Sequence, residues 1–552
     1  MVSRAVGSRG GTSLPGEPSR LGGGPGAAAG AGSRARPRGD ATDRRILFLD
    51  PTTAYRTKTP TSVRPTTFVG GSLLVRGGHP DTWSALGEAL TAAGFVIEER
   101  DGLGREVLDA ADLEEDHHAA LSEVWVERLT LAPDPDREDP VFRSLDTWRL
   151  LQSYRALVGD DRARLADVGL EHPVSRGARP NPYTTPHPYT TPHPVGLTMY
   201  AEAGWGGRQP VNWLGPEPRP RRPERPTPTV VVMDSAIGEH PWLGPEHVTR
   251  DPEVLGASIG IPAVEDTAET TGSSDRFTGE LQPDAGHGTF IAGLVRQACP
   301  DAHVLGVRLF SGEGDVTESD LLEALQLLAL RHLLALEGRG PEGGLAPYQP
   351  LHVLTISLGY YHEQPEDETF DALLLAPLQL LGRYGVCVVA SAGNDATNRP
   401  SYPAAFAPAD GGLGDQGDPI PVLSVGALNP DGTVALFSND GPWVRFWRPG
   451  ASLVSTLPTT FDGSVEAHNV LVNERGQVRA ALDPDDFTAG FAVWSGTSFA
   501  APVLAGQLAD RLLDTMPEGA DRAGASGPPT PEQLVERARA ALLDLPEIGL
   551  RP

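Results

Sequence analysis

The stretch "TVVVMDSAIGEHPWL", residues 229–243, is the starting point for predicting the fold. Four apolar residues, Val230–Met233, lead directly into Asp234. A continuous apolar run predicts a strand that is buried on both faces. Asp is common at the turn that ends such a strand, so Asp234 alone indicates little. It gains meaning only if the chain supplies a histidine and a nucleophile elsewhere.

Apolar runs alternate with helical patterns from Val230 to about residue 515. A long helix is expected at 317–338, where Thr317 and Asp320 give a weak capping signal. This alternation predicts a mostly parallel α/β sheet with helices on both faces and a site at the carboxyl ends of the strands. The further strand candidates are "AHVLGVRLF" (302–310), "LHVLTISLG" (351–359), "GVCVVASAGN" (385–394) and "IPVLSVGAL" (420–428).

The rest of the chain differs in composition from this region. A small α+β pattern begins near Arg45, with a helix expected at 81–94 and a mostly helical stretch continuing to about 170. A hexad, "PYTTPH", is repeated at 182–187 and 188–193, and two histidines without further ligands do not indicate a metal site. The sequence thus predicts five parts: a disordered Gly/Arg/Pro-rich leader (1–44), a small α/β N-terminal domain (45–170), a Pro-rich linker (171–228), the main α/β domain (229–515), and a C-terminal tail (516–552) with one short helix at 530–545.

Composition excludes several classes of function. The 552 residues carry a net charge of -28, which argues against a nucleic-acid or anionic-membrane partner. The chain has no run of about 18 apolar residues, so no membrane span is expected. The N-terminus has no apolar core of a secretory signal, so we expect a cytoplasmic protein, with secretion as the alternative. Two cysteines exclude a disulfide scaffold.

The motif "GHGTFIAGLV", residues 286–295, supplies a candidate histidine. Glycines flank His287, and an apolar helical pattern follows at once. Flanking glycines permit a sharp turn and close approach of a substrate. A Gly-His-Gly sequence is often only a turn, but the helix that follows predicts that His287 is rigidly held at a helix start.

The motif "SGTSFAAPVLAG", residues 495–506, supplies a candidate nucleophile. Ser498 is expected to open a helix, where its own N–H is unpaired and can donate to an oxyanion. Pro502 is expected within the first helical turn. Ser495 is the rival nucleophile, and Ser498 is preferred because it lies at the junction of turn and helix.

The motif "VVASAGND", residues 388–395, ends a predicted strand on Asn394. A side-chain amide at this place can donate a hydrogen bond to a tetrahedral oxyanion. The alternative interpretation is that Asn394 caps a turn.

The order Asp, His, Asn, Ser resembles that of the subtilisin-like serine proteases, or subtilases. The resemblance covers about 285 residues and implies a subtilisin-like three-layer domain. It is supported by weaker similarities at "ISLG" (356–359), "SYPAAF" (401–406), "LFSNDG" (436–441) and "RPGASLVST" (448–456).

The resemblance implies a role for each motif. Asp234 orients His287, which takes a proton from Ser498, and the serine forms an acyl-enzyme with a protein or peptide substrate. Asn394 and the Ser498 N–H bind the oxyanion. The residues expected to contact substrate are Ser357, Leu358, Gly359, Ala392, Gly393 and Ser401.

The chain departs from the family pattern at three places. Phe290 replaces a non-catalytic histidine, so no loss of activity is expected. Arg448 replaces the alanine of an Ala-Pro-Gly loop. The longer stretch between Ser455 and Trp494 predicts a surface hairpin at 468–482. The chemistry requires no cofactor; calcium suits acidic loops such as "DPDDF", but no ligand spacing assigns a site.

Two other functions remain as alternatives. One is a catalytically silent subtilase-fold binding or regulatory module. The other is a related acid-acting carboxyl peptidase, against which His287 and Asn394 argue. The N-terminal domain is expected to be either a removable prodomain or a region that recognises a partner protein, and the second is preferred because no export signal is visible.

Overall fold

A computed structural model represents the chain, and the description covers most of its residues. The leader at 1–44 and the repeated hexads at 182–193 lie outside the described residues. The structure describes residues 45–56, 63–77, 80–136, 146–175, 207–212, 215–223, 225–262, 279–282, 284–310, 316–341, 346–364, 372–415, 418–516 and 528–549. Those residues belong to one compact unit.

The main region is built on a seven-stranded sheet in which every neighbouring pair is parallel. In spatial order the strands are β10 (Val248–Arg250), β13 (His303–Phe310), β9 (Thr229–Ser235), β15 (Val353–Ile356), β16 (Cys387–Ser391), β17 (Leu423–Leu428) and β18 (Phe446–Pro449). In this order the strand that bears Asp234 is third of seven and has a neighbour on each side.

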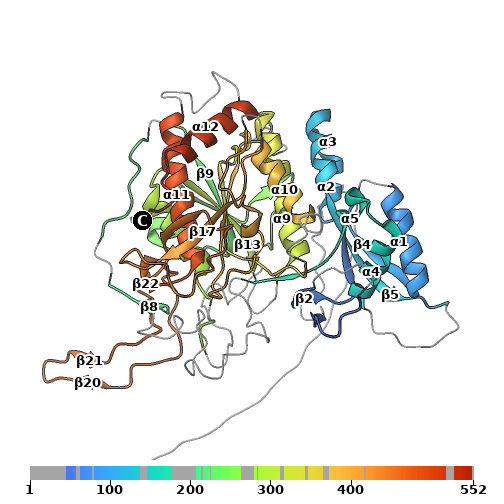
Figure 1. Ribbon diagram of the computed structural model, residues 1–552. Helices are drawn as coiled ribbons and strands as arrows, with labels where there is room; N and C mark the ends of the chain where they lie inside the picture. Colours follow the sequence, from blue (N-terminus) through green and yellow to red (C-terminus); the bar gives the residue numbers. More distant parts are fainter. Residues whose placement is uncertain are drawn as a thin grey trace, which may run out of the picture. The chain divides into compact units, whose positions relative to one another are not determined.

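Helices cover both faces of this sheet. In Figure 1, α11 (Thr497–Thr515), drawn in red, lies on one side of the strands, and α9 (Glu318–Leu336) and α10 (Ala372–Arg383) lie on the other. The helix α8 (His287–Ala298) packs beside α11. The predicted three-layer α/β domain is therefore confirmed.

Strand β9 shows why the apolar runs are continuous. Val230 and Val232 belong to the core cluster that contains α8 and α11. Val231 and Met233 belong to the cluster that contains α9 and α10. Successive side chains of a strand point to opposite faces, so a strand covered on both sides needs apolar residues at every position.

The N-terminal region contains a four-stranded antiparallel sheet in the order β4, β5, β3, β6. The helix expected at 81–94 is confirmed as α1 (Pro80–Ala93). The mostly helical expectation missed β5 (Val126–Pro133), in which apolar and polar residues alternate only at Leu129–Leu131. The other elements are β3 (Ser72–Arg76), β4 (Phe95–Asp101), β6 (Val168–Leu170), α2 (Arg105–Ala110), α3 (Glu115–Val124), α4 (Thr147–Val158) and α5 (Arg162–Leu165).

The N-terminal region shares a hydrophobic core with the main region. Leu74, Trp125 and Val174 lie in the same buried cluster as Leu327 of α9. The amide of Gln326, also on α9, accepts a hydrogen bond from the Val126 N–H at 2.6 Å. Apolar burial and satisfied hydrogen bonds therefore hold the N-terminal region and the main region together.

Smaller elements complete the fold. The predicted hairpin at 468–482 is confirmed, and its strands are exposed throughout and drawn projecting in Figure 1. Among the described residues, no helix combines the length and the apolar character that crossing a bilayer requires. The remaining elements are β1 (Ile46–Leu49), β2 (Thr66–Val69), β7 (Pro173–Val174), β8 (Gln209–Pro210), β11 (Glu253–Val254), β12 (Ala257–Ser258), β14 (Val316–Thr317), β19 (Leu453–Thr456), β20 (Val470–Val472), β21 (Val478–Ala480), β22 (Phe491–Trp494), α12 (Pro531–Leu543) and the 3₁₀ turns Pro241–Leu243 and Ala404–Phe406.

The side chain of Arg448 binds the C-terminal tail. Its fully buried guanidinium donates to the carbonyls of Pro546 and Glu547 at 2.9 and 3.0 Å. It also donates to the side chain of Gln507 at 2.7 Å. Burial lowers the pKa of Arg448 to about 10. The replacement of the family's alanine thus anchors the segment that follows α12.

Candidate active site

The structure joins the first two predicted site residues directly. His287 begins α8, and its Nδ1 lies 2.7 Å from Oδ1 of Asp234 at the end of β9. Asp234 is fully buried and the His287 side chain is 5% exposed. Oδ1 of Asp234 also accepts a hydrogen bond from the Ser235 N–H at 2.7 Å. A carboxylate held in this way fixes the ring orientation and the tautomer of the imidazole.

The start of α8 is shaped by the glycine that precedes it. Gly286 is the N-cap residue and adopts a φ of 79°, in the left-handed region. The hydroxyl of Ser235 accepts a hydrogen bond from the Gly288 N–H at 2.9 Å, which satisfies one of the unpaired donors of the first turn. Sequence reasoning missed this role of Ser235, whose only signal is its place next to Asp234.

Aromatic rings surround the imidazole. The ring centroids of Trp494 and Phe499 lie 5.5 and 5.0 Å from that of His287. Phe290 packs against Phe499 with a centroid distance of 4.5 Å. The residue that departs from the family pattern at position 290 is therefore a core aromatic that helps to hold the helix of the histidine against the helix of the serine.

Ser498 is the second residue of α11 and is buried. The prediction for Pro502 was wrong, because this residue lies inside the helix and beyond its first turn. A proline there cannot donate the helical hydrogen bond to the carbonyl of Ser498. The hydroxyl of Ser357 donates to that carbonyl instead, at 3.0 Å. The predicted substrate strand thus supports the helix of the predicted nucleophile.

The rival serine occupies a different environment. Ser495 lies before the N-cap residue Gly496, and its hydroxyl accepts a hydrogen bond from the Ser452 N–H at 2.9 Å. This contact joins the turn before α11 to the start of β19. Ser495 therefore has a structural partner of its own.

Asn394 lies beside the start of α11 with its amide fixed in orientation. Its Oδ1 accepts hydrogen bonds from the N–H and the hydroxyl of Thr497, at 2.8 and 2.9 Å. Because the oxygen is held by these donors, the Nδ2 group is directed away from Thr497. Sequence reasoning missed Thr497, although it stands between two residues that it singled out.

The residues expected to contact substrate differ in their surroundings. Leu358 and Ala392 are buried in the hydrophobic core. Gly393 adopts a φ of 104° and donates its N–H to the Thr497 hydroxyl at 3.2 Å. Ser401 is buried and precedes Tyr402, which pairs with Tyr360 in an isolated bridge.

The backbone of Gly359 is already paired within the chain. Its N–H donates to the Ser175 carbonyl at 2.9 Å, and its carbonyl accepts from the Ser175 N–H at 3.1 Å. The pairing is antiparallel. Strand β7, which directly precedes Ser175 in the chain, pairs with β14 at the start of α9. The end of the N-terminal region, at Ser175, therefore occupies both backbone hydrogen-bonding groups of Gly359.

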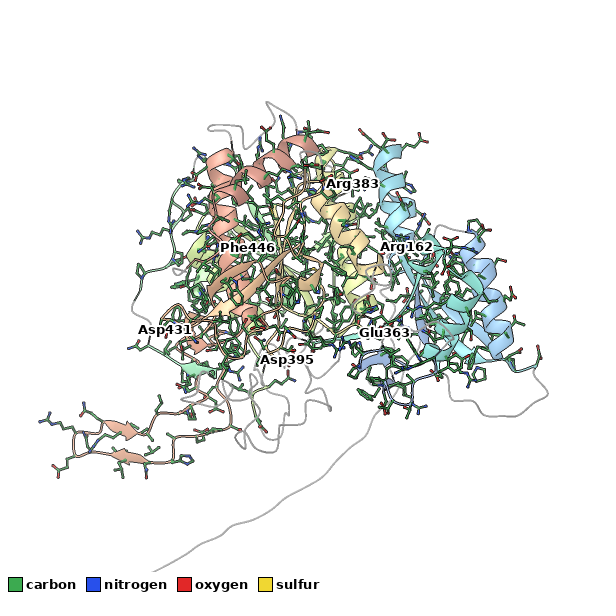
Figure 2. All side chains as sticks on the ribbon, viewed as in Figure 1. Arg162, Glu363, Arg383, Asp395, Asp431 and Phe446 are labelled. Carbon is green, nitrogen blue, oxygen red and sulfur yellow. The ribbon has the colours of Figure 1, made fainter. Side chains whose placement is uncertain are left out.

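A buried cluster at the same junction, His172, His362 and Glu363, has ligand atoms within 4.8 Å of one another, but hydrogen bonds already occupy them. His172 Nδ1 lies 2.9 Å from Glu318, and its Nε2 lies 3.1 Å from Glu363, which is labelled in Figure 2. Nδ1 of His362 accepts a hydrogen bond from the Gln364 N–H at 3.0 Å. The Nε2 of a neutral His362 then carries hydrogen and has no lone pair for a metal ion. The cluster is therefore an ion pair.

Two other sets of side chains have the ligand types of a metal site. Glu114, His117 and Glu337 have their ligand atoms close together, but Arg339 Nε already lies 2.8 Å from Glu337. In the acidic loop named above, burial raises the pKa of Asp485 to about 6. Among the described residues that loop does not gather three ligands at metal-binding distance.

Known proteins match part of the chain. A family model described as the subtilase family matches residues 226–518, more than half of the chain. The serine protease AprX of Bacillus subtilis is 24% identical over 308 residues, which are 52% of this chain and 58% of that protein. Subtilisin BL of Lederbergia lenta is 26% identical over 235 residues, 42% of this chain and 66% of its own. The chain thus spans less than two thirds of either relative.

Solved structures are more distant. Fervidolysin from Fervidobacterium pennivorans, a keratinolytic enzyme related to subtilisin, is 16% identical, with a TM-score of 0.39 over 88% of this chain and 65% of its own. A cold-adapted subtilisin-like serine proteinase is 20% identical, with a TM-score of 0.31 over 56% of this chain and 79% of its own.

Proposed function

The chain belongs to the subtilase family, and on this premise we propose that it is a serine endopeptidase with Ser498 as its nucleophile. The observation that carries the proposal is the 2.7 Å contact between His287 Nδ1 and the buried Asp234 carboxylate, beside the helix whose second residue is Ser498. This arrangement leaves the imidazole Nε2 for a hydroxyl group.

In the proposed reaction, the Ser498 hydroxyl oxygen attacks the carbonyl carbon of the substrate while His287 Nε2 takes its proton. Asp234 stabilises the resulting imidazolium. Collapse of the tetrahedral intermediate breaks the C–N bond, and His287 gives the proton to the leaving amine. Water then hydrolyses the acyl-enzyme by the same steps. These steps use only side chains and backbone of the chain, so we propose that the chemistry needs no cofactor.

Oxyanion stabilisation is assigned to Asn394 Nδ2 and the backbone N–H of Ser498. The support for this assignment is the clamp on Asn394 Oδ1 by Thr497, which directs the amide nitrogen away from the helix. The Ser498 N–H belongs to the first turn of α11, where helical N–H groups have no intrahelical acceptor. Donors fixed before reaction need no rearrangement when charge develops.

The proposed substrate is a protein or peptide that binds in extended form along Ser357–Gly359, with Ala392, Gly393 and Ser401 nearby. Gly359 presents one N–H and one carbonyl, and the structure pairs both with an extended backbone. Backbone pairing of this kind accepts many sequences, because side chains do not take part in it. The negative charge of the chain gives no support to a nucleic-acid substrate or a membrane partner.

The test is hydrolysis of a peptide library by the wild type and two variants. We expect Ser498→Ala to lower kcat by about 10⁴-fold or more with unchanged folding. The matched control is Ser495→Ala, which removes the rival hydroxyl of the same motif and should keep most of the activity. Equal loss in both variants, or activity in Ser498→Ala, would contradict the proposal.

The alternative is a silent subtilase-fold binding module. A fluorophosphonate probe separates the two, because only a serine activated by a base reacts with it. We expect labelling of the wild type and none of Ser498→Ala. A folded wild type that the probe leaves unlabelled would favour the silent module.

We also propose that the N-terminal region, residues 45–175, covers the substrate strand as a prodomain-like segment. The support is the antiparallel pairing of Ser175 with Gly359, which uses the groups that a substrate would need. The ion pair of His172 with Glu318 and Glu363 holds the same segment three residues earlier.

Mass spectrometry of the purified protein over time tests this second proposal. We expect the wild type to lose the N-terminal region as peptide hydrolysis rises, and Ser498→Ala to keep its full length. A wild type that stays intact and is fully active from the start would reject it, and would favour a domain that stays attached to recognise a partner protein.

A further inference from the structure

Asn439 is a fully buried amide in the turn between β17 and β18, and the proposed reaction does not use it. The sequence gives it only as part of a short family-like motif. All of the hydrogen-bonding positions of its side chain are occupied. A buried amide with every position satisfied specifies the geometry of the groups around it.

The partners of Asn439 lie on both sides of Asn394. Its Nδ2 donates to the carbonyl of Ala392 at 2.9 Å. Its Oδ1 accepts hydrogen bonds from the N–H groups of Asp395 and Thr397, at 3.1 and 3.2 Å. The two backbone N–H donors and the carbonyl acceptor together fix which side-chain atom is oxygen and which is nitrogen.

The backbone of Asn439 contributes a further contact to the same loop. Its N–H donates to the carbonyl of Gly393 at 3.0 Å. Gly393 has a φ of 104°, and a Cβ atom built on it would lie 2.4 Å from Nδ2 of Asn439. The loop therefore takes a conformation that favours glycine, with Asn439 packed against it.

Further contacts support Asn439 itself. Its Nδ2 also donates to the phenolic oxygen of Tyr361 at 3.1 Å. The Tyr361 hydroxyl donates to the carboxylate of Asp395, which is labelled in Figure 2 and follows Asn394 in the chain. The guanidinium of Arg399 lies 4.6 Å from the Tyr361 ring centroid.

We propose that Asn439 is a positioning residue that sets the oxyanion donor. Thr497 holds the side chain of Asn394, and Asn439 holds the peptide backbone at 392–397 from which that side chain projects. The inference rests on the proposed function, because it assigns Asn439 to the same reaction. An oxyanion donor acts only when it meets the developing charge at hydrogen-bond distance, so a shift of its backbone reduces its effect.

A double-mutant cycle tests the proposal. We expect Asn439→Ala to lower kcat by about 10–100-fold and to change KM by less than about threefold, because the loss falls on the transition state. In the Asn394→Ala background the same change should lower kcat by no more than about threefold, because the donor that it positions is already absent. Equal losses in both backgrounds would overturn the inference.

Asn439→Ser keeps one small polar group in the buried site without adding a charge, so it serves as the milder variant if alanine prevents folding. We expect an intermediate loss of kcat that also disappears in the Asn394→Ala background. The control is His332→Ala, which removes another buried side chain that anchors a loop, at Leu351, and should leave kcat unchanged.

The same measurements separate this inference from the proposed function. A wild type without hydrolysis, or a Ser498→Ala variant that equals it, contradicts the proposed function. A wild type that is active while Asn439→Ala matches it in kcat overturns only the role of Asn439.

Discussion

Among the described residues, the buried histidines His287 and His172 each hydrogen-bond a carboxylate through Nδ1, and they differ at the second ring nitrogen. His287 has Asp234 on Nδ1 at 2.7 Å, and in the described part of the chain no carboxylate pairs with its Nε2. His172 has Glu318 on Nδ1 and Glu363 on Nε2, at 2.9 and 3.1 Å. One imidazole keeps a nitrogen for a reacting group, and the other has both nitrogens committed.

The surroundings of the two rings give them different tasks. Burial by itself would lower the pKa of His172, but hydrogen bonds from both ring nitrogens to Glu318 and Glu363 outweigh it and raise the pKa to about 10. The ring is therefore a fixed cation between two anions. A proton carrier must release its proton, so His172 is suited to holding two segments together, and the single-carboxylate arrangement of His287 is suited to catalysis.

The largest effect is expected from His287→Ala. Removing the proposed base should lower kcat by about 10⁵–10⁶-fold, the scale known for a triad member in a related subtilase. Peptide hydrolysis and the unfolding midpoint, measured on the same preparation, check this prediction. A variant that loses stability instead of turnover would place His287 with His172 as a structural residue.

Asp234→Asn should lower kcat by about 10⁴-fold, because the amide donates to Nδ1 and favours the wrong tautomer of His287. The fold should persist, since the side chains have the same shape. The pH dependence of kcat/KM for the variant and the wild type is the measurement. Activity within about tenfold of the wild type would show that His287 does not depend on this carboxylate.

His172→Ala should act on stability rather than on turnover. It removes the cation that lies between Glu318 and Glu363 and leaves Arg155 beside Glu363 alone, which costs about 3–5 kcal/mol in the free energy of unfolding. Urea unfolding in the Ser498→Ala background avoids self-digestion. His332→Ala is the matched control, because its imidazole is buried between neutral groups, and it should cost less. Equal losses would reduce His172 to a packing residue.

The ion pair also predicts a pH dependence of stability. The pKa of His172 is raised from 6.5 to about 10 in the folded chain, so its contribution is complete below pH 6.5 and is lost as the pH rises toward 10. Between these values the folded state holds one more proton, and the free energy of unfolding should fall by up to about 1.4 kcal/mol per pH unit.

Other polar groups face His172 or the carboxylates that hold it. They are Glu318, Glu363, His362, Tyr360 on Glu318, and Arg155 of α4 beside Glu363. Burial lowers the pKa of His362 to about 4, so it stays neutral throughout the window. Urea midpoints of Ser498→Ala between pH 7 and 10 give the slope, and His172→Gln in the same background should remove it. An unchanged slope in that variant would contradict the assignment.

Much of the fold could be predicted because its signals are local. The apolar run before Asp234 predicted a strand buried on both faces, and the capping pair Thr317 and Asp320 predicted the start of α9, which the structure confirms. Strand β5 could not be separated from the helices around it, because its pattern is short and only tertiary pairing reveals it.

The candidate site shows the same division. Asp234, His287, Asn394 and Ser498 stand in short motifs, because each must lie where a strand ends or a helix begins. Thr497, Ser235 and Asn439 act through hydrogen bonds, and those of Asn439 reach residues more than forty positions away. No local pattern indicates such partners.

The sequence by itself determined the family, the sheet and the motifs, because apolar periodicity and turn chemistry act between residues close in the chain. Only the tertiary structure decided that the hydroxyl of Ser357 replaces the hydrogen bond that Pro502 lacks, and that Ser175 pairs with Gly359. It also decided that His172 lies between two carboxylates that stand nearly 150 and more than 190 positions later. These contacts depend on how distant segments meet, and buried polar groups require a partner wherever the fold places one.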